Sequence, residues 1–336
     1  KINIICPSEI DSPFLSIVDN GIGMGPEELI QNMRIGCKDP NVKREAGDLG
    51  RFGSGMKTAS FSHARRLTVI SKQKGKKLAG ACWDIDEIEE KNTWCLRVLS
   101  QQDIKNFNHF DKDLIAGAGT QLVWEKIRKF EETAHNDSKT SIETSMVELG
   151  KYLALHFHKF LQGSRKLKIY VQHLKIDPID PFLTTKNGYQ EGPTDETFVK
   201  GGKLLIKSHT LPHHSNLTQS EIDKIGGMEE IYKGQGLYIY RENRLIIAGG
   251  WMGLSRTYQL GKLARIEINM PSGLDDEWST DVKKSSLQLP QKIKNRLKNL
   301  IQQPIKKSKR TYNYRGKKEE ANEYWKIIET RDKNII

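Results

Sequence analysis

The first half of the chain alternates short apolar runs with turn residues, a pattern typical of strands interspersed with helices. Apolar runs at 2–6 and 14–18, joined by a Pro-Ser-Glu turn, are predicted to be two strands. Proline and acidic residues open a helix at 26–33, which has an apolar face. Further helices are predicted at about 55–64 and 142–161, and further strands at 66–71, 78–85, 93–99 and 120–125.

The second half is richer in strands and ends in a basic helix. Strands are predicted at 166–172, 203–208, 236–241, 244–248 and 263–269. The pair Glu242-Asn243 predicts a tight hairpin, and the polar stretch 184–200 is predicted to be a surface loop. From Leu289 onward the pattern is helical. The fold class is therefore predicted to be α+β, with parts at 1–163, 164–290 and 291–336.

Composition adds a charge signal. The chain has 336 residues and a net charge of +12, a length that favours two domains. No run approaches the about 20 apolar residues that span a bilayer, and the four cysteines form no Cys-x-x-Cys pair. We therefore expect a cytoplasmic protein with no membrane partner. The segment 283–318 has many lysines and arginines and no acid. This pattern predicts either a surface that binds a polyanion such as DNA or a solvated basic helix.

A glycine-rich turn follows the strand at 14–18. An aspartate at the end of a buried strand, here Asp19, is well placed to accept a hydrogen bond from an adenine amino group. Gly21 and Gly23 would let the backbone approach the base closely. The same residues also fit a type I′ hairpin turn, in which Asn-Gly is the favoured pair.

A second glycine-rich motif, Gly50 to Thr58, leads into the helix predicted at 55–64 and overlaps its first turn. It has the glycine spacing of a Walker loop, but Met56 intervenes before Lys57-Thr58. One extra helical residue turns the lysine by about 100°, so the Walker geometry fails. A dinucleotide fold is also excluded, because neither turn lies in a βαβ unit. The remaining interpretation is that the motif presents free backbone amides at the start of a helix, where they could bind a triphosphate.

Together the two turns and a later Gly-Thr motif resemble the GHKL (Bergerat-fold) ATPase superfamily. The matching motifs are Asp19-x-Gly21-x-Gly23, Gly50-x-x-Gly53-x-Gly55-x-Lys57 and Gly117-x-Gly119-Thr120. The resemblance implies a Bergerat-type ATP-binding α/β sandwich in 1–163, with ATP and Mg²⁺ as cofactors. The nucleotide ligands it implies are Asp19, Gly21, Gly23, Met24, Lys38, Gly50, Arg51, Phe52, Gly53, Ser54, Gly55, Met56, Lys57 and Thr120.

The second half resembles the GHL branch of that superfamily and is closest to prokaryotic MORC-like proteins. In this branch an S5-like transducer domain, here 164–290, supplies a lysine to the γ-phosphate. The segment Trp278 to Ser285 looks like that lysine segment, with Lys284 the preferred ligand and Lys283 the second. A solvated charge pair is the other interpretation of these lysines.

The chain departs from the family pattern at its start. The family places a helix with a catalytic Glu and a magnesium-binding Asn before the adenine motif, but the residues before Asp19 are predicted to be strands. No metal ligand is therefore assigned in this chain. We expect a longer protein that begins upstream of Lys1; a chain unable to hydrolyse ATP is the other interpretation.

The resemblance implies an ATPase that acts as an ATP-gated dimeric clamp, in which two protomers associate when ATP binds. The basic 283–318 segment would contact the backbone of DNA rather than read its bases. A bacterial role in DNA transactions or in antiviral (phage) defence follows only by family analogy. The alternative function is a non-hydrolysing, nucleotide-gated scaffold that recruits protein partners.

Overall fold

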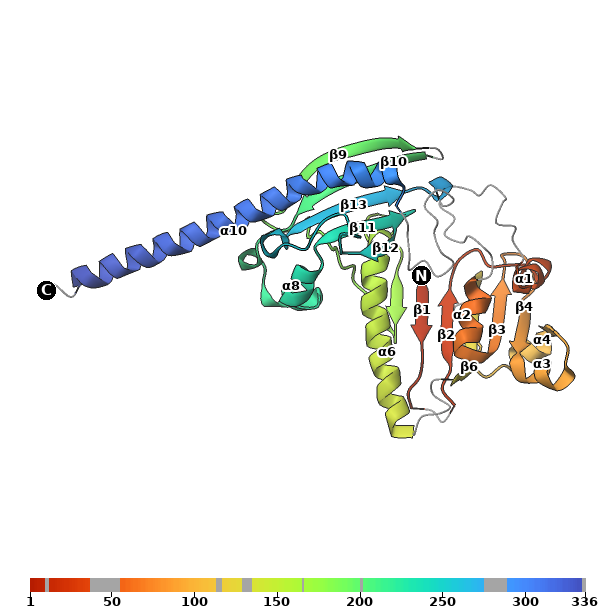
Figure 1. Ribbon diagram of the computed structural model, residues 1–336. Helices are drawn as coiled ribbons and strands as arrows, with labels where there is room; N and C mark the ends of the chain where they lie inside the picture. The colour runs from red at the N-terminus through yellow and green to blue at the C-terminus, as the bar shows by residue number, and fades with distance from the viewer. Residues whose placement is uncertain are drawn as a thin grey trace. The chain divides into compact units, whose positions relative to one another are not determined.

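The computed structural model describes residues 1–9, 12–36, 55–112, 117–128, 135–164, 166–199, 202–274 and 289–333. The chain divides into two compact units, Lys1–Pro178 and Ile179–Ile336. Each unit has its own sheet and its own hydrophobic core (Figure 1). No helix among the described residues is both long enough and apolar enough to cross a membrane.

The first unit is built on an eight-stranded sheet with the order β5-β4-β3-β6-β2-β1-β7-β8. Its strands are β1 (Ile2–Ile5), β2 (Leu15–Asp19), β3 (Ala64–Lys72), β4 (Ala79–Asp84), β5 (Arg97–Leu99), β6 (Gly119–Ile127), β7 (Ile169–Val171) and β8 (Leu174–Lys175). Neighbouring strands are antiparallel except for β1 and β7. The strands predicted at 66–71, 78–85 and 120–125 are present, and the strand predicted at 93–99 is present only over Arg97–Leu99.

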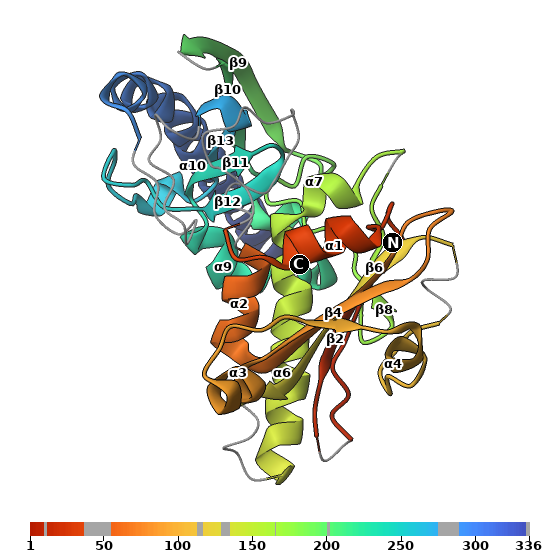
Figure 2. The ribbon, with the colours of Figure 1, turned by 90° about the vertical axis from the view of Figure 1, so that its right-hand side faces the viewer.

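Helices cover the two faces of this sheet unequally. The helices are α1 (Pro26–Met33), α2 (Gly55–His63), α3 (Ile85–Lys91), α4 (Gln101–Lys105), α6 (His135–His156) and α7 (His158–Leu161). On β3, Val69 packs with α1 and α2, whereas its neighbour Ile70 packs with Ile104 of α4. Successive strand residues point to opposite faces, so α4 lies across the sheet from α1 and α2 (Figure 2). This layering is an α/β sandwich, and the predicted α+β class is confirmed.

The end of the first sheet differs from the expected division of the chain. The strand predicted at 166–172 is present as β7, and it pairs in parallel with β1, with Ile2 opposite Ile169. Ile169 and Val171 are buried in the same cluster as Ile4 and Leu15. Because this strand completes the first core, the compact units divide after Pro178 rather than at the predicted position after residue 163.

The second unit has a five-stranded sheet with the order β12-β11-β13-β10-β9. Its strands are β9 (Gln190–Val199), β10 (Gly202–Thr210), β11 (Gly236–Arg241), β12 (Arg244–Ala248) and β13 (Ala264–Met270). Its helices are η1 (His214–Asn216), α8 (Gln219–Lys224), α9 (Met228–Lys233), η2 (Gln259–Gly261), η3 (Ser272–Leu274) and the long α10 (Gln291–Lys333). Ile293, Leu297, Ile301 and Ile305 pack one side of α10 onto the sheet.

Two local predictions in the second unit have opposite outcomes. The hairpin at Glu242-Asn243 is confirmed, because both residues have positive φ, 47° and 66°, as a type I′ turn requires. The loop prediction at 184–200 is wrong over the ten residues of β9. This edge strand is exposed and polar, so it has no apolar alternation to reveal it, and it exists because it pairs with β10.

Candidate nucleotide-binding site

The first glycine turn begins where β2 ends. The β2 strand places Asp19 at its last position, and the Oδ1 atom of Asp19 accepts a hydrogen bond from the Gly21 amide at 2.8 Å. A Cβ atom on residue 21 would lie 2.7 Å from that oxygen, closer than ordinary van der Waals contact. The carboxylate therefore organises the turn that follows it while remaining half-exposed.

The glycines of the first turn and of the later Gly-Thr motif pack against neighbouring backbone. Gly23 has a φ of +65°, and a Cβ atom there would lie 1.8 Å from the carbonyl oxygen of Lys72. A Cβ atom on Gly119 would lie 2.2 Å from the carbonyl oxygen of Asp19. Only glycine leaves room for this approach. Two motifs separated by about a hundred residues in the sequence therefore meet where the inner strands β2, β3 and β6 end or begin.

Sheet register brings the threonine of the late motif to the same place. Thr120 on β6 lies opposite Asp19 on β2 and, on its other side, opposite Ser71 on β3. The sequence motifs alone give no register, so this convergence of Asp19, Met24 and Thr120 is a finding of the structure.

Ser71 is the residue that joins these pieces, and the sequence did not single it out. Its fully buried hydroxyl accepts a hydrogen bond from the Met24 amide at 2.8 Å and donates one to the Gly119 carbonyl at 3.0 Å. It also lies 2.8 Å from the Thr120 hydroxyl. The available signal was a serine directly after the apolar run Leu67 to Ile70, which is too common to identify a site.

The start of α2 carries the described part of the second glycine motif. Gly55 opens the helix and has open space around its Cα, whereas Met56 packs in the same cluster as Met24. Lys57 is buried, and its Nζ donates to the carbonyl oxygen of Asn32 at 2.6 Å, near the end of α1. In this arrangement the Lys57 ammonium links α2 to α1.

Several predicted site residues lie outside the described residues. These are Lys38, Gly50, Arg51, Phe52, Gly53, Ser54, Lys283 and Lys284. The described residues therefore bring Asp19, Gly21, Gly23, Met24 and Thr120 together and place Gly55, Met56 and Lys57 at the beginning of α2.

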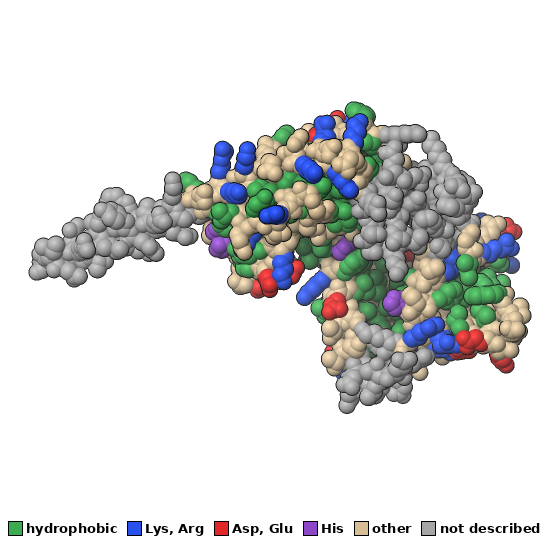
Figure 3. Space-filling model, viewed as in Figure 1, with side chains coloured by type: hydrophobic (Ala, Val, Ile, Leu, Met, Phe, Trp, Pro, Cys, Tyr) green, Lys and Arg blue, Asp and Glu red, His purple; other side chains and the backbone are tan. Residues whose placement is uncertain are grey.

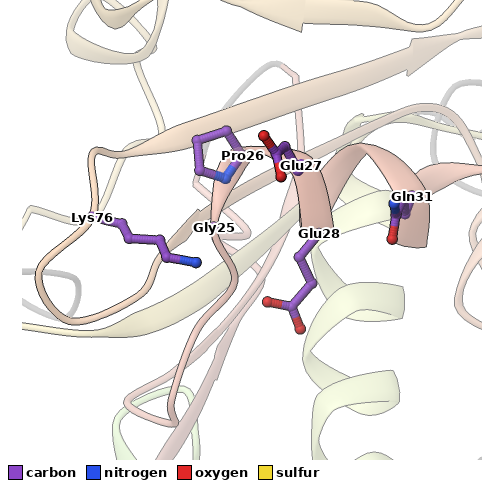
Figure 4. A pocket seen from close by; sticks show the side chains of 6 residues that line it. All are labelled: Gly25, Pro26, Glu27, Glu28, Gln31 and Lys76. Atoms are coloured by element: carbon purple, nitrogen blue, oxygen red, sulfur yellow. The ribbon is translucent and has the colours of Figure 1, made fainter.

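A separate cavity of about 480 Å³ lies at the first turn of α1. Its lining residues are Gly25, Pro26, Glu27, Glu28, Gln31 and Lys76, and Figure 4 shows Lys76 reaching toward the Gly25 end of the helix. None of the predicted nucleotide ligands that lie among the described residues lines this cavity. Its two carboxylates also suit a triphosphate poorly, so we do not assign the nucleotide to it.

The described residues fit the adenine end of ATP better than they fit a metal. The Asp19 carboxylate is half-exposed and can accept a hydrogen bond from an amine-bearing base. Among the described residues, no cluster of three His, Cys, Asp or Glu side chains could hold a metal ion. The residues that would bind Mg²⁺ are therefore not identified in the described part of the chain.

The fold of the first unit is an α/β sandwich, and Asp19, Met24 and Thr120 meet at the ends of its central strands. Residues 1–117 match the family model described as histidine kinase-, DNA gyrase B- and HSP90-like ATPase. The match contains both glycine turns and ends just before Gly119-Thr120. It supports the GHKL ATPase superfamily for this part of the chain. No curated protein matches the sequence.

Proposed function

We propose that the protein binds and hydrolyses ATP, and that the residues around Asp19 form its adenine pocket. The observation that carries the proposal is the meeting of the Asp19 turn with Gly119-Thr120 through the buried Ser71 hydroxyl. The half-exposed Asp19 carboxylate can accept a hydrogen bond from the adenine amino group. The Thr120 hydroxyl, held by Ser71, lies on the neighbouring strand to orient the base.

The triphosphate would extend from this pocket toward the start of α2. Backbone amides at a helix N-terminus attract phosphate oxygens. In this proposal the segment Gly50 to Lys57 would provide such amides, and Lys38 would add a positive charge. Mg²⁺, when bound, would neutralise phosphate charge during hydrolysis. The general base and the Mg²⁺ ligand have no assigned residue in this chain.

The finer parts of the proposal concern the second unit. It would act as a transducer domain that senses the γ-phosphate through Lys284, with Lys283 the second choice. Two protomers would close on each other when ATP binds and form a clamp. The clamp would act on DNA, contacted by the basic 283–318 segment, in bacterial DNA transactions or phage defence. MORC-like proteins are the model for this part of the proposal.

Hydrolysis is the test that separates this function from a non-hydrolysing scaffold. We expect phosphate release from ATP by the full-length protein, abolished by Asp19→Asn and by Lys284→Ala. ATP binding by the wild-type protein without turnover would support the scaffold. Loss of activity in Asp19→Asn but normal activity in Lys284→Ala would retain the adenine pocket and reject the sensor lysine.

A further inference from the structure

The side of α10 that faces away from the sheet is basic. Its exposed cationic residues are Lys292, Arg296, Lys298, Lys306, Lys309 and Arg310, and Figure 3 shows lysine and arginine side chains along this part of the second unit. The 19 residues from Lys292 to Arg310 span about 27 Å at the helical rise. We call these six residues the basic face.

Most of the basic face has no carboxylate to neutralise it. Among the ion pairs of the described residues, Arg296 alone of the six has an acidic partner, and its Nε lies 2.6 Å from Oδ2 of Asp195. The sequence 283–318 contains no acid that could compensate the other five from within the segment. Five exposed cations therefore remain available to an external polyanion.

Exposed apolar and aromatic side chains lie among these cations. Tyr258 is 38% exposed and Leu260 is 43% exposed, and the Nζ of Lys309 lies 5.2 Å from the centre of the Tyr258 ring. Tyr314 is 70% exposed and follows Arg310 by one helical turn, on the same side of α10. Charge alone would not require rings at these positions.

Hydrogen bonds hold the Tyr258 segment firmly. The buried Gln235 side chain accepts from the Tyr258 amide at 3.2 Å and donates to the Tyr258 carbonyl at 3.4 Å. The buried Ser308 hydroxyl of α10 donates to the Leu260 carbonyl at 2.6 Å. The Tyr258 ring is thus presented on a fixed backbone beside the basic face, which lowers the entropic cost of binding.

We infer that the basic face and the rings of Tyr258 and Tyr314 bind single-stranded nucleic acid. The cations would contact the phosphates, and the two rings would stack on unpaired bases. A duplex hides its base faces, and an acidic polypeptide offers no bases, so neither would use the rings. The inference rests on the proposed action on DNA, and it names the strand form and the surface. Deoxyribose and ribose strands share this chemistry.

Anisotropy measurements with the full chain test the inference. The probes are labelled dT20, rU20 and a 20-base-pair duplex, measured without nucleotide at several salt concentrations. We expect at least one single strand to bind tighter than the duplex, and the two strands show which sugar is preferred. Tyr258→Ala with Tyr314→Ala should weaken single-strand binding about 30-fold or more, because two stacking rings are lost. The matched pair Tyr258→Phe with Tyr314→Phe keeps both rings and should bind as the wild type does.

Charge variants test the other half of the surface. Lys306→Gln with Lys309→Gln should reduce the steepness of log affinity against log salt by about 1.4, because two phosphate contacts are lost. Lys233→Gln with Glu229→Gln is the control, because these two residues form an ion pair on α9, 2.8 Å apart and outside the basic face. It removes an existing ion pair without changing the net charge, and it should leave the salt dependence unchanged.

Three results would overturn the inference: duplex binding as tight as single-strand binding, equal competition by polyglutamate, or unchanged affinity in the alanine pair. ATP binding by the same preparations keeps the two proposals apart. Nucleic-acid failure with normal ATP binding rejects this surface alone. Normal single-strand binding with no ATP binding rejects the proposed ATPase and retains the surface.

Discussion

A side chain at Gly23 would be opposed by two effects, the left-handed backbone conformation and the clash with the Lys72 carbonyl. Comparison with a second glycine separates the two. Gly75 has a similar φ of +80° but open space around it, compared with +65° and a 1.8 Å approach at Gly23. Gly75→Ala should cost about 1–2 kcal/mol of unfolding free energy, from backbone strain alone. Gly23→Ala should cost at least about 2 kcal/mol more, because β3 must shift. Urea unfolding measures both, and equal losses would contradict the packing described here.

Ser71 offers a second test at the residue scale. Ser71→Ala leaves the buried Met24 amide and the Gly119 carbonyl without their partner, which should cost about 1–3 kcal/mol of stability. If Ser71 also positions Thr120, the KM for ATP should rise while kcat changes little. Ser62→Ala is the matched control, since among the described residues the exposed Ser62 hydroxyl binds only the Ala59 carbonyl of its own helix, at 2.8 Å. A normal KM in Ser71→Ala would assign this serine a purely structural role.

Sequence patterns select single residues of the candidate site but do not give their spatial partners. Asp19, Gly21 and Gly23 can be selected because short motifs preserve residue type and spacing. The meeting of Thr120 with Asp19 depends on the register of three strands, which no local pattern encodes. Ser71 could not be selected, because its role comes entirely from the residues that this register places around it.

At the scale of elements, a cluster of charges joins β4 to α3. Asp84, at the end of β4, accepts a hydrogen bond from Nε of Arg66 at 2.7 Å and caps α3 by accepting from the Asp86 amide at 3.1 Å. Burial tends to raise the Asp84 pKa, but the hydrogen bond and charge of Arg66, with Lys126, lower it below its ordinary value. The carboxylate therefore stabilises the folded state in its ionised form.

This depressed pKa fixes the direction of the pH dependence. The contribution of Asp84 is present above the pKa of the unfolded chain, about 3.9, and is lost as pH falls through the folded value. Asp84→Asn should therefore lower stability at pH 7 by about 1–3 kcal/mol and flatten its decline below about pH 4.

Chemical unfolding measured at intervals between about pH 2 and about pH 8 tests this effect. Glu9→Gln is the control, because the Glu9 pKa is also lowered, by its hydrogen bond with Lys139, yet its side chain is 76% exposed. Solvent screening should leave that variant close to the wild type. An unchanged acid limb in Asp84→Asn would rule out the described ion pair.

Whole elements were predictable where apolar periodicity was strong. The 26–33 helix and the strand at 66–71 bury clear apolar faces, and both are present. The β9 edge strand was not predictable, because most of its residues are exposed and its sequence has no alternation of apolar and polar residues. The place of β7 was not predictable either, since an apolar strand does not reveal which sheet it will complete.

At the scale of the whole molecule, the two units should unfold separately, because each has its own core. We expect two calorimetric transitions. Leu67→Ala should lower only the first-unit transition and Leu237→Ala only the second-unit transition, each by about 2–5 kcal/mol, since both leucines are fully buried. One shared transition that shifts with either variant would contradict independent cores.

Nucleotide should act first on the transition of the unit that holds Asp19. ATP at 100 times its dissociation constant should stabilise the first unit by about 2.7 kcal/mol, and contact of Lys284 with the γ-phosphate should raise the second-unit transition as well. The Leu67→Ala and Leu237→Ala variants identify which transition belongs to which unit. Stabilisation of the second-unit transition alone would place the nucleotide away from Asp19.

The central claim is that Asp19 holds the adenine of ATP, and isothermal titration of ATP into wild type and Asp19→Asn tests it most directly. A hydrogen bond to a charged group is worth about 1.5–3 kcal/mol, so Asp19→Asn should weaken ATP about ten- to 150-fold. Asp177→Asn makes the same chemical change at a carboxylate that is 80% exposed in the same unit, and it should bind as wild type does. Equal affinity of Asp19→Asn and wild type, or no binding by wild type, would contradict the account.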